Sequence, residues 1–472
     1  MEFTRRTFIH AAGLGAVGLG TAEQQDGHDW DRLRRKLSGR LVRPGDAEYD
    51  QVRRPFNTLY ANRRPAAVAR CVRPSDVQAC VDFAANQRIP VAARSGGHSY
   101  VAYSVPENGL VIDLSALAGV RVAADGTATV GAGTTMIDLY EAIGRAGRAL
   151  PAGSCGTVGI AGLALGGGKS VLNRKFGLTC DHLLGARIVT PDSRLRSVDR
   201  GSEPDLLWGL RGGGGGNFGV VTSFTFHTEP GPDLVTYQLA YPPGAATELF
   251  AAWQDWMLDA PDELWASCDV VSGDPATFRA NGNLVGPVGR LRALLADLHR
   301  RTGITPTTEI LREMDYLTAM RFWAGCIPQC GPNNGSAFVA SSCMVGRRIE
   351  DPAEVTALLA GRTEVYVQFS SLGGKVASVA PDATAFPHRS AVATAQILVY
   401  PTNITPAQGR RHVREVRDGL AALVGNTGYV NYIDPGIPDW RTAYYGANYP
   451  RLRKLARRYD PDRVFAFRQG LA

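Results

Sequence analysis

The chain has 472 residues, of which 44% are hydrophobic and 20% charged, a balance typical of globular proteins that excludes a disordered or fibrous chain. Its length predicts two or three domains with sizeable cores. The formal net charge of +7 comes almost entirely from arginines scattered along the chain, with short runs at 32–35 and 451–458 only. Because a basic stripe or patch is missing, we do not expect a nucleic acid partner.

The N-terminus has the pattern of an export signal. Thr4-Arg5-Arg6-Thr7-Phe8-Ile9 closely matches a twin-arginine motif and precedes a weakly apolar run over 11–22. That run is too short to cross a bilayer as a permanent helix, and a chance basic N-terminus is the alternative interpretation. Residues 1–28 are predicted to be a signal peptide read by the Tat translocase, so the mature protein is expected to be secreted. Gly13–Gly18 matches G-x-G-x-x-G, but no strand precedes it, so we do not interpret it as a dinucleotide site.

The segment after the signal alternates short helical and strand-like patterns. Three helices are predicted, the second opening after Pro74 and the third after Thr134-Thr135, over 29–40, 75–86 and 138–147. Apolar runs predict strands over 67–73, 91–94, 110–113, 120–122, 127–131 and 220–226. This alternation predicts an α+β layer built around a bound cofactor.

Two glycine-rich turns each contain one nucleophilic side chain. They are Arg94-Ser95-Gly96-Gly97-His98-Ser99-Tyr100 and Gly153-Ser154-Cys155-Gly156-Thr157-Val158-Gly159. Glycine lets the backbone approach a bound group closely and adopt φ > 0, and successive free N–H groups bind anions such as a pyrophosphate. Taken singly, His98 could be an ordinary loop histidine and Cys155 a small buried hydrophobe. Together, in this order and before Gly162–Gly168, they predict a cofactor held covalently at two points.

These segments resemble the berberine bridge enzyme-like branch of the vanillyl-alcohol oxidase superfamily. The resemblance implies FAD bonded through its flavin ring to both His98 and Cys155. It also implies further FAD-binding residues, namely Arg94, Ser95, Gly96, Gly97, Ser99, Val158, Gly159, Gly162, Gly219, Val221 and Asn448. The chain departs from the family pattern at Gly156, where the family usually has Pro, and at 161–163, where it usually has Gly-Gly-His.

A third block, Leu207–Val221, contains five consecutive glycines at 212–216. Such a run is entropically costly unless the backbone lies against a ligand, and a flexible linker fits poorly because an apolar strand follows at once. The resemblance places Asn217–Val221 along the adenine half of FAD.

The middle of the chain has fewer glycines, with helices predicted over 246–258 and 289–302 between strand-like runs. We expect a separate substrate domain there, a large antiparallel sheet with helices on one face. The blocks 429–434, 444–452 and 460–465 resemble the family's C-terminal return to the FAD domain. The predicted fold is therefore α+β: a two-part PCMH-type FAD-binding domain over 47–230 and 425–472, with an inserted antiparallel-sheet-plus-helices substrate domain over 231–424.

The resemblance also suggests the acid–base groups. Tyr432, the second tyrosine of Tyr429-Val430-Asn431-Tyr432-Ile433-Asp434, stands where the family keeps its base; a core tyrosine in a strand is the alternative. A phenol with a pKa near 10 would need a neighbouring positive charge or the flavin to act as a base. Gln396 resembles a polar position on a facing strand. Gln368 and Ser370 share one face of the strand before Gly373-Gly374, and neither is a strong base, so a single-base mechanism at Tyr432 is expected.

The predicted function is that of an exported FAD-dependent oxidase. It would take a hydride from a bulky small molecule, a secreted natural product in the first instance, and reduce O2 to H2O2. Val158, three residues after Cys155, occupies a position where the resemblance associates a small β-branched side chain with oxidases and Leu with dehydrogenases. The alternatives are an oligosaccharide oxidase acting at the reducing-end carbon and a non-catalytic flavin-bearing binding or resistance protein. Trp253, Trp256 and Trp265 fit either a sugar groove or a helix core.

The eight cysteines show no CxxC spacing and the histidines no HxH or HExxH pattern, so no metal site is expected. Cys326 and Cys330 could form a disulfide outside the cell or remain free thiols, and both possibilities stay open at this point.

Overall fold

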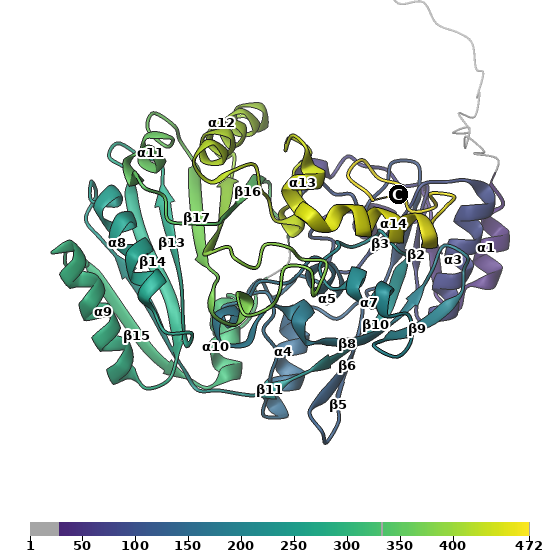
Figure 1. The fold of residues 1–472 in the computed structure, drawn as a ribbon. Coiled ribbons are helices and arrows are strands. Elements are labelled where there is room, and N and C mark those ends of the chain that lie inside the picture. Colours follow the sequence, from purple (N-terminus) through teal and green to yellow (C-terminus); the bar gives the residue numbers. More distant parts are fainter. Residues whose placement is uncertain (1–27, 332–333, 472) are drawn as a thin grey trace, which may run out of the picture.

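The computed structural model describes residues 28–331 and 334–471, so the predicted signal peptide at 1–28 lies outside the described residues except for His28. The chain builds two halves, each organised around its own hydrophobic core (Figure 1). The first half combines the N-terminal part with the C-terminal segment, and the second contains one large sheet. This arrangement agrees with the predicted α+β class.

The first half contains three small sheets. A four-stranded sheet has the order β1-β2-β4-β3, with β2, β3 and β4 parallel and β1 antiparallel. A five-stranded antiparallel sheet has the order β5-β6-β10-β8-β9, and β11 pairs with β7. The strands are β1 (Arg40–Val42), β2 (Ala67–Arg70), β3 (Val91–Arg94), β4 (Leu110–Asp113), β5 (Val120–Val122), β6 (Thr127–Gly131), β7 (Arg148–Ala149), β8 (Leu183–Val189), β9 (Leu195–Asp199), β10 (Val220–His227) and β11 (Glu229–Pro230).

Short helices cover these sheets and connect them. They are α1 (Trp30–Lys36), α2 (Tyr49–Val52), η1 (Thr58–Tyr60), α3 (Pro74–Gln87), α4 (Met136–Arg145), α5 (Ile160–Leu165), α6 (Asn173–Phe176), η2 (Thr179–His182) and α7 (Pro204–Leu210).

The first predicted helix is shorter than expected. Asp29 caps α1 by accepting the N–H of Arg32, but the helix ends at Lys36 and not at Arg40. The N–H groups of Ser38 and Gly39 donate to the Asp76 carboxylate of α3 at 2.9 and 3.2 Å, which turns the chain into β1. The amphipathic pattern could not show this because the partner carboxylate lies on another element.

The second half is a seven-stranded antiparallel sheet of order β15-β12-β14-β13-β17-β18-β16. Its strands are β12 (Leu234–Ala240), β13 (Leu264–Val271), β14 (Thr277–Val285), β15 (Thr308–Met314), β16 (Val339–Val345), β17 (Val365–Ser371) and β18 (Ala393–Val399). Helices cover one face of this sheet, as predicted: α8 (Ala246–Asp259), α9 (Val288–Thr302), α11 (Pro352–Ala357) and α12 (Pro406–Val424).

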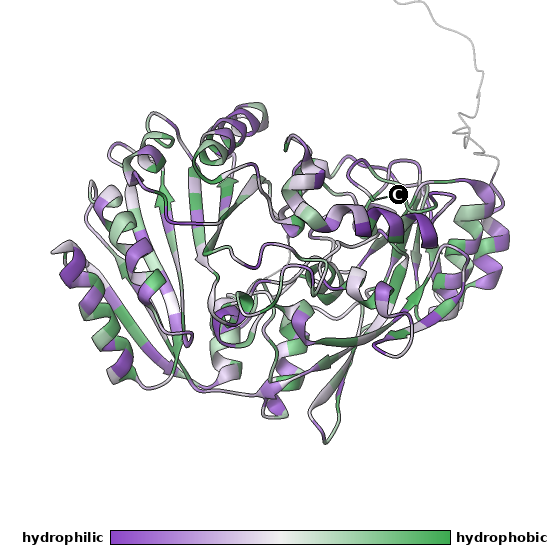
Figure 2. Ribbon diagram, viewed as in Figure 1, coloured by the Kyte–Doolittle hydropathy of each residue, from purple (hydrophilic) through white to green (hydrophobic). Residues whose placement is uncertain are grey.

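Strand alternation gives this sheet two different faces. In β13 the side chains of Leu264, Ala266, Cys268 and Val270 enter the second core, where they meet apolar residues of α8 and α9. The intervening side chains face the other way, toward the first half. Figure 2 shows the matching pattern on the helices, which are hydrophilic outward and hydrophobic toward the sheet. Trp253 and Trp256 of α8 are buried in this core, whereas Trp265 of β13 faces the opposite side.

Helix α10 (Tyr316–Trp323) belongs to the sequence range expected for the substrate domain but packs on α4 of the first half. Arg321 binds Glu141 of α4 through two hydrogen bonds of 2.6 and 2.8 Å, and Leu317 packs against Gly144. The two halves are therefore joined by a packed helix as well as by the chain connections.

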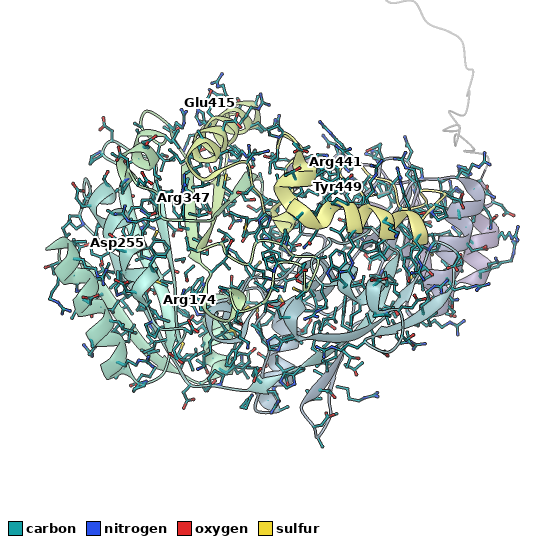
Figure 3. All side chains as sticks on the ribbon, viewed as in Figure 1. Arg174, Asp255, Arg347, Glu415, Arg441 and Tyr449 are labelled. Carbon is teal, nitrogen blue, oxygen red and sulfur yellow. A yellow bond between two sulfur atoms is a disulfide. The ribbon has the colours of Figure 1, made fainter. Side chains whose placement is uncertain are left out.

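The short η3 (Gly374–Val376) lies between β17 and β18. After α12, the C-terminal segment returns to the first half through η4 (Val430–Tyr432), α13 (Trp440–Tyr445), η5 (Gly446–Asn448) and α14 (Tyr449–Tyr459). Leu452 and Leu455 of α14 join the first core. Arg441 of α13 donates to the Tyr449 hydroxyl at 3.0 Å and ties the two helices together (Figure 3). Among the described residues, no helix has the length and apolar character needed to span a bilayer.

Candidate functional site

A cavity of about 780 Å³ lies where the two halves meet. Its lining includes residues of five parts of the chain that matter here: the two predicted glycine-rich turns with α5, the glycines of 214–219, the inner face of the large sheet, the 429–433 segment, and the C-terminal residues 465–469. This volume is near the upper end of the range for small-molecule and cofactor sites. The cavity therefore brings together segments that sequence analysis had marked separately.

The two glycine-rich turns touch each other through their backbones. A Cβ on Gly96 would stand 2.4 Å from the Gly159 nitrogen, and a Cβ on Gly159 would stand 2.0 Å from Ser95 Oγ and 2.3 Å from the Gly96 nitrogen. Gly97 alone of these three has a positive φ, at 73°. Glycine is thus required at Gly96 and Gly159 because one turn packs on the other, a reason that the sequence pattern did not reveal.

His98 is positioned by one aromatic ring and one hydroxyl. Its imidazole stacks on Phe56 with ring centroids 3.7 Å apart, and its Nε2 lies 2.9 Å from Thr157 Oγ1. Burial lowers the pKa of His98 from 6.5 to about 4. The ring is therefore neutral at physiological pH, the state in which an imidazole nitrogen can act as a nucleophile.

Cys155 lies beside the same hydroxyl. Its thiol is free and exposed to the cavity, and its Sγ lies 3.7 Å from Thr157 Oγ1. The Thr157 hydroxyl therefore lies between the two predicted attachment residues. Behind this turn, Cys326 and Cys330 form a disulfide, which decides the alternative that the sequence left open. The Cys326 sulfur lies 3.5 Å from the point where a Cβ on Gly156 would stand.

The other predicted FAD-binding residues divide into two groups. Those that line the cavity are Ser95, Gly96, Gly97, Ser99, Val158, Gly159, Gly162, Gly219 and Val221. Arg94 and Asn448 lie outside the lining and contact protein groups. The Arg94 guanidinium binds the Asp113 carboxylate, and the Asn448 amide donates to the carbonyls of Pro381 and Thr384 at 2.8 and 3.1 Å. Their predicted contact with a cofactor stays a prediction.

Tyr432 faces the cavity from η4 as part of an aromatic cluster. Its ring stacks on Tyr100 with centroids 5.2 Å apart and meets the edge of Tyr429 at 5.0 Å. Burial, with a smaller contribution from Tyr429, raises the pKa of Tyr432 well above its usual value of 10. The phenol is thus well placed toward the cavity, but its burial opposes the anionic form that a base requires.

Gln396 also lines the cavity, where its Nε2 donates to the Tyr100 hydroxyl. It lies opposite Gln368 of β17 in the strand register. Gln368 and Ser370 both line the cavity, as strand alternation predicted. Gln396 therefore contacts the stacked partner of Tyr432.

Lys169 was not identified as a site residue from the sequence. It follows Gly166-Gly167-Gly168 directly, and its Nζ lies 5.1 Å from the centroid of the Tyr432 ring. The same ammonium donates to Ser370 Oγ at 3.0 Å and to Thr394 Oγ1 at 3.3 Å. Burial lowers the pKa of Lys169 from 10.5 to about 7, while the Asp269 carboxylate acts in the opposite direction. A lysine directly after three glycines, in a chain with few lysines, was the signal that could have marked it.

The sheet presents a polar and aromatic wall to the cavity. Its hydrogen-bonding side chains come from four neighbouring strands: Ser267, Asn281, Gln368, Ser370 and Gln396. Trp265 of β13 and Trp323 of α10 meet edge to face at 5.6 Å and line the same cavity. From the sequence, Trp265 fitted either a sugar groove or a core, and Trp323 was not identified, because only the register of β13 and the docking of α10 bring the two indoles together. Within residues 28–331 and 334–471, no three His, Cys, Asp or Glu side chains gather as a metal site.

Comparisons with known proteins identify two conserved domain types. Residues 65–199 match the family described as "FAD binding domain", and residues 428–472 match the one described as "Berberine and berberine like". An uncharacterized FAD-linked oxidoreductase of Bacillus subtilis is 33% identical over 455 residues, covering 92% of this chain and 97% of that protein.

Two further similarities involve berberine bridge enzyme-like proteins and carbohydrate oxidases. A chitooligosaccharide oxidase of Gibberella zeae is 28% identical over 91% of this chain and 92% of its own length. The solved structure of the Physcomitrella patens protein BBE-like 1 superposes with a TM-score of 0.88 at 26% identity, covering 94% of this chain and 98% of that one.

Proposed function

The chain belongs to the berberine bridge enzyme-like family of FAD-linked oxidoreductases, and we propose that it is an exported oxidase with FAD attached to both His98 and Cys155. One observation supports this most strongly: His98, Cys155 and Tyr432 line a single cavity although they come from three separate segments. Two anchors and one candidate base thus face the same space.

The residues present suit FAD. The cavity is large enough for a cofactor, and Gly162 of α5 offers an open face, since a Cβ there would meet no protein atom within 4 Å. Gly214, Gly215, Gly216 and Val221 also line the cavity. Bound FAD would supply the hydride acceptor and pass the electrons to O2, giving H2O2.

His98 and Cys155 differ in the features that make each of them able to form a bond to the flavin ring. The low pKa of His98 keeps its imidazole neutral, and Thr157 engages Nε2, so Nδ1 is the nitrogen available for a bond to the flavin ring. Among the described residues, that Nδ1 has no hydrogen-bond partner. The Cys155 thiol is exposed in the cavity, 3.7 Å from the same hydroxyl. Both bonds would hold the ring beside the substrate without a lid.

Tyr432 is the proposed base for the proton that leaves the substrate during hydride removal. It faces the cavity, and its stacking on Tyr100 holds the ring in a fixed orientation. Gln396, through the Tyr100 hydroxyl, positions that stacked partner.

The substrate proposed first is a bulky molecule with several hydroxyl groups. The supporting feature is the sheet wall, whose Ser, Asn and Gln side chains can exchange hydrogen bonds with hydroxyls. Trp265 and Trp323 offer apolar ring faces beside it. These features suit a glycosylated natural product, and they equally favour the second candidate, an oligosaccharide oxidised at its reducing-end carbon. The similarity to a chitooligosaccharide oxidase supports that second candidate.

The test is anaerobic mixing of purified protein with a panel of oligosaccharides and glycosylated metabolites, followed by flavin absorbance. Bleaching by one class identifies the substrate, and Tyr432→Phe should slow that bleaching by roughly 10²-fold, the usual loss for a positioned acid–base group. Binding without bleaching by any ligand would instead support a flavin-bearing binding protein. Export is tested separately: Arg5→Lys with Arg6→Lys should retain the protein in the cytoplasm, and unaltered secretion would contradict the proposed Tat signal.

A further inference from the structure

Lys169 is a partly buried cation that lines the cavity and has an unusual set of partners. Two of its three N–H donors point to the hydroxyls of Ser370 and Thr394, both of which are almost fully buried. Its third direction is occupied by the ring of Tyr432, 5.1 Å from the ammonium nitrogen.

No carboxylate balances this charge at contact distance. Among the described residues Lys169 forms no ion pair, and the Asp269 carboxylate that influences it accepts a hydrogen bond from Gln368 Nε2 at 3.1 Å. Burying an ammonium without an anionic partner is costly, and the cost is relieved either by loss of its proton or by a negative charge nearby. Of the three side chains that the Lys169 ammonium contacts, Tyr432 alone has a hydroxyl that can ionise in the accessible pH range, because Ser and Thr hydroxyls do not ionise there.

The loop that carries Lys169 is attached to the segment that carries Tyr432. The Tyr429 hydroxyl accepts the backbone N–H groups of Gly168 and Lys169 at 2.9 and 3.2 Å, and it also accepts the Asn431 side-chain amide at 3.0 Å. Asn431 in turn donates to the Leu163 carbonyl at 2.9 Å. The distance between the ammonium and the Tyr432 ring is therefore set by a hydrogen-bonded framework and not by two free side chains.

We propose that Lys169 is the positioning residue of the Tyr432 base: its ammonium is the built-in counter-charge of the Tyr432 phenolate. This inference rests on the proposed role of Tyr432. A cation over an aromatic face is attracted to the neutral ring and more strongly to the phenolate, whose negative charge is shared by the ring. The attraction lowers the pKa of Tyr432, whereas burial alone raises it. The lowered pKa of Lys169 fits the same picture, since an ammonium destabilised by burial gains most from a nearby anion.

Four further titratable groups face this pair, and one of them is Tyr366 of β17, whose pKa is raised by burial and by Tyr400, with smaller contributions from Asp269 and Tyr432. Tyr100 stacks on Tyr432 from the first glycine-rich turn, Tyr429 meets its edge from η4, and Asp269 approaches Lys169 from β13. A neutral Tyr100 or Tyr429 does not oppose the phenolate, and burial raises the pKa of both phenols. Burial raises the pKa of Tyr432 too, so the proposal expects Tyr432 to ionise first only because the Lys169 ammonium lies over its ring.

The experiment is an ultraviolet difference titration of phenolate formation in the flavin-loaded protein, comparing wild type with Tyr432→Phe to isolate one tyrosine. We expect a Tyr432 midpoint below 10 in the wild type. Lys169→Met removes the charge at similar length and should raise the midpoint by about 1–3 pH units, the usual effect of an opposite charge at this distance. Lys169→Arg should recover most of the wild-type midpoint. Lys175→Met is the matched control, because Lys175 pairs with Glu263 at 2.7 Å outside the cavity lining and should leave the midpoint unchanged.

A Tyr432 midpoint at or above pH 10 in the wild-type protein overturns the proposal. This result needs no lysine variant, so the proposal can be decided even if Lys169→Met fails to fold. Equal midpoints in wild type and Lys169→Met overturn it as well. The titration uses no substrate, so its result is independent of whether turnover is found. Once a substrate is known, the basic shift of the pH profile for flavin reduction in Lys169→Met provides a second readout. If turnover depends on Tyr432 but the pH profile of flavin reduction in Lys169→Met is the same as in wild type, the proposed function is retained and the role of Lys169 is rejected.

Discussion

Gly162→Ala separates the stability of the fold from the binding of the cofactor. Gly162 lies inside α5, is exposed to the cavity, and has no protein atom within 4 Å of the point where a Cβ would stand. Alanine in a helix interior is more favourable than glycine by about 0.8–1 kcal/mol. If only the protein mattered, the substitution would therefore raise the free energy of unfolding by up to about 1 kcal/mol.

For FAD binding we expect the opposite effect: the same substitution should weaken the affinity for the cofactor. A methyl group that enters an occupied, well-packed contact costs about 1–3 kcal/mol, which corresponds to roughly 5- to 150-fold weaker binding. We expect Gly162→Ala protein to unfold at a slightly higher urea concentration in its flavin-free form, yet to incorporate flavin more slowly and at a lower ratio to protein. The measurements are urea unfolding of flavin-free protein and the ratio of flavin to protein absorbance after incubation with FAD.

Gly159→Ala is the matched comparison, three residues earlier. Its Cβ would stand 2.0 Å from Ser95 Oγ and 2.3 Å from the Gly96 nitrogen, so the two glycine-rich turns would have to separate. Overpacking of this kind destabilises by about 1–3 kcal/mol, and this variant should lose both stability and flavin. A Gly162→Ala protein that is stabilised and also loads flavin at the wild-type rate would refute the placement of the cofactor against α5.

Three other outcomes are expected. With two covalent anchors, His98→Ala and Cys155→Ala should each retain acid-stable flavin and the double variant should release it; free FAD in the acid supernatant of wild-type protein would contradict the linkage. Val158 lines the cavity, and Val158→Leu should fill a gap for dioxygen and slow reoxidation while leaving reduction by substrate unchanged, as stopped-flow absorbance would show. In flavin-free protein the folded state lowers the pKa of His98 to about 4, so the unfolded state binds more protons between pH 4 and 6.5 and stability falls as the pH falls through this window. At pH 5 the contribution of His98 relative to pH 7.5 is about 2 kcal/mol, so urea unfolding should show a loss that is smaller by about this amount in His98→Ala than in wild type; a loss remains in the variant because burial also lowers the pKa of His388 to about 4.

Several features of this protein follow from local sequence. Strands at 110–113, 120–122 and 127–131 were predicted with the bounds that the structure shows, because short apolar runs over a few positions determine them. The turns that carry His98 and Cys155 were recognisable because glycine marks close backbone approach within the segment itself. The antiparallel sheet with helices on one face was also predictable, since both faces are encoded by alternation along each strand.

Other features depended on residues far apart in the chain. Helix α1 ends early because its exit is held by Asp76, and Trp265 faces the cavity because β13 sits in one register of the sheet. Lys169 meets Ser370 and Thr394 over separations of 201 and 225 residues.

The sequence by itself determined which local segments form strands, helices and reactive turns, because backbone propensity and side-chain alternation act over a few residues. Only the tertiary structure decided that His98, Cys155, Tyr432 and Lys169 share one cavity and that Arg94 and Asn448 do not line it. The same holds for ionisation: the amino-acid type sets a pKa near 6.5 for His98 and 10.5 for Lys169, whereas burial in the assembled site moves them to about 4 and about 7. Desolvation is a property of the packed environment, to which distant segments contribute, and no local pattern in the chain encodes it.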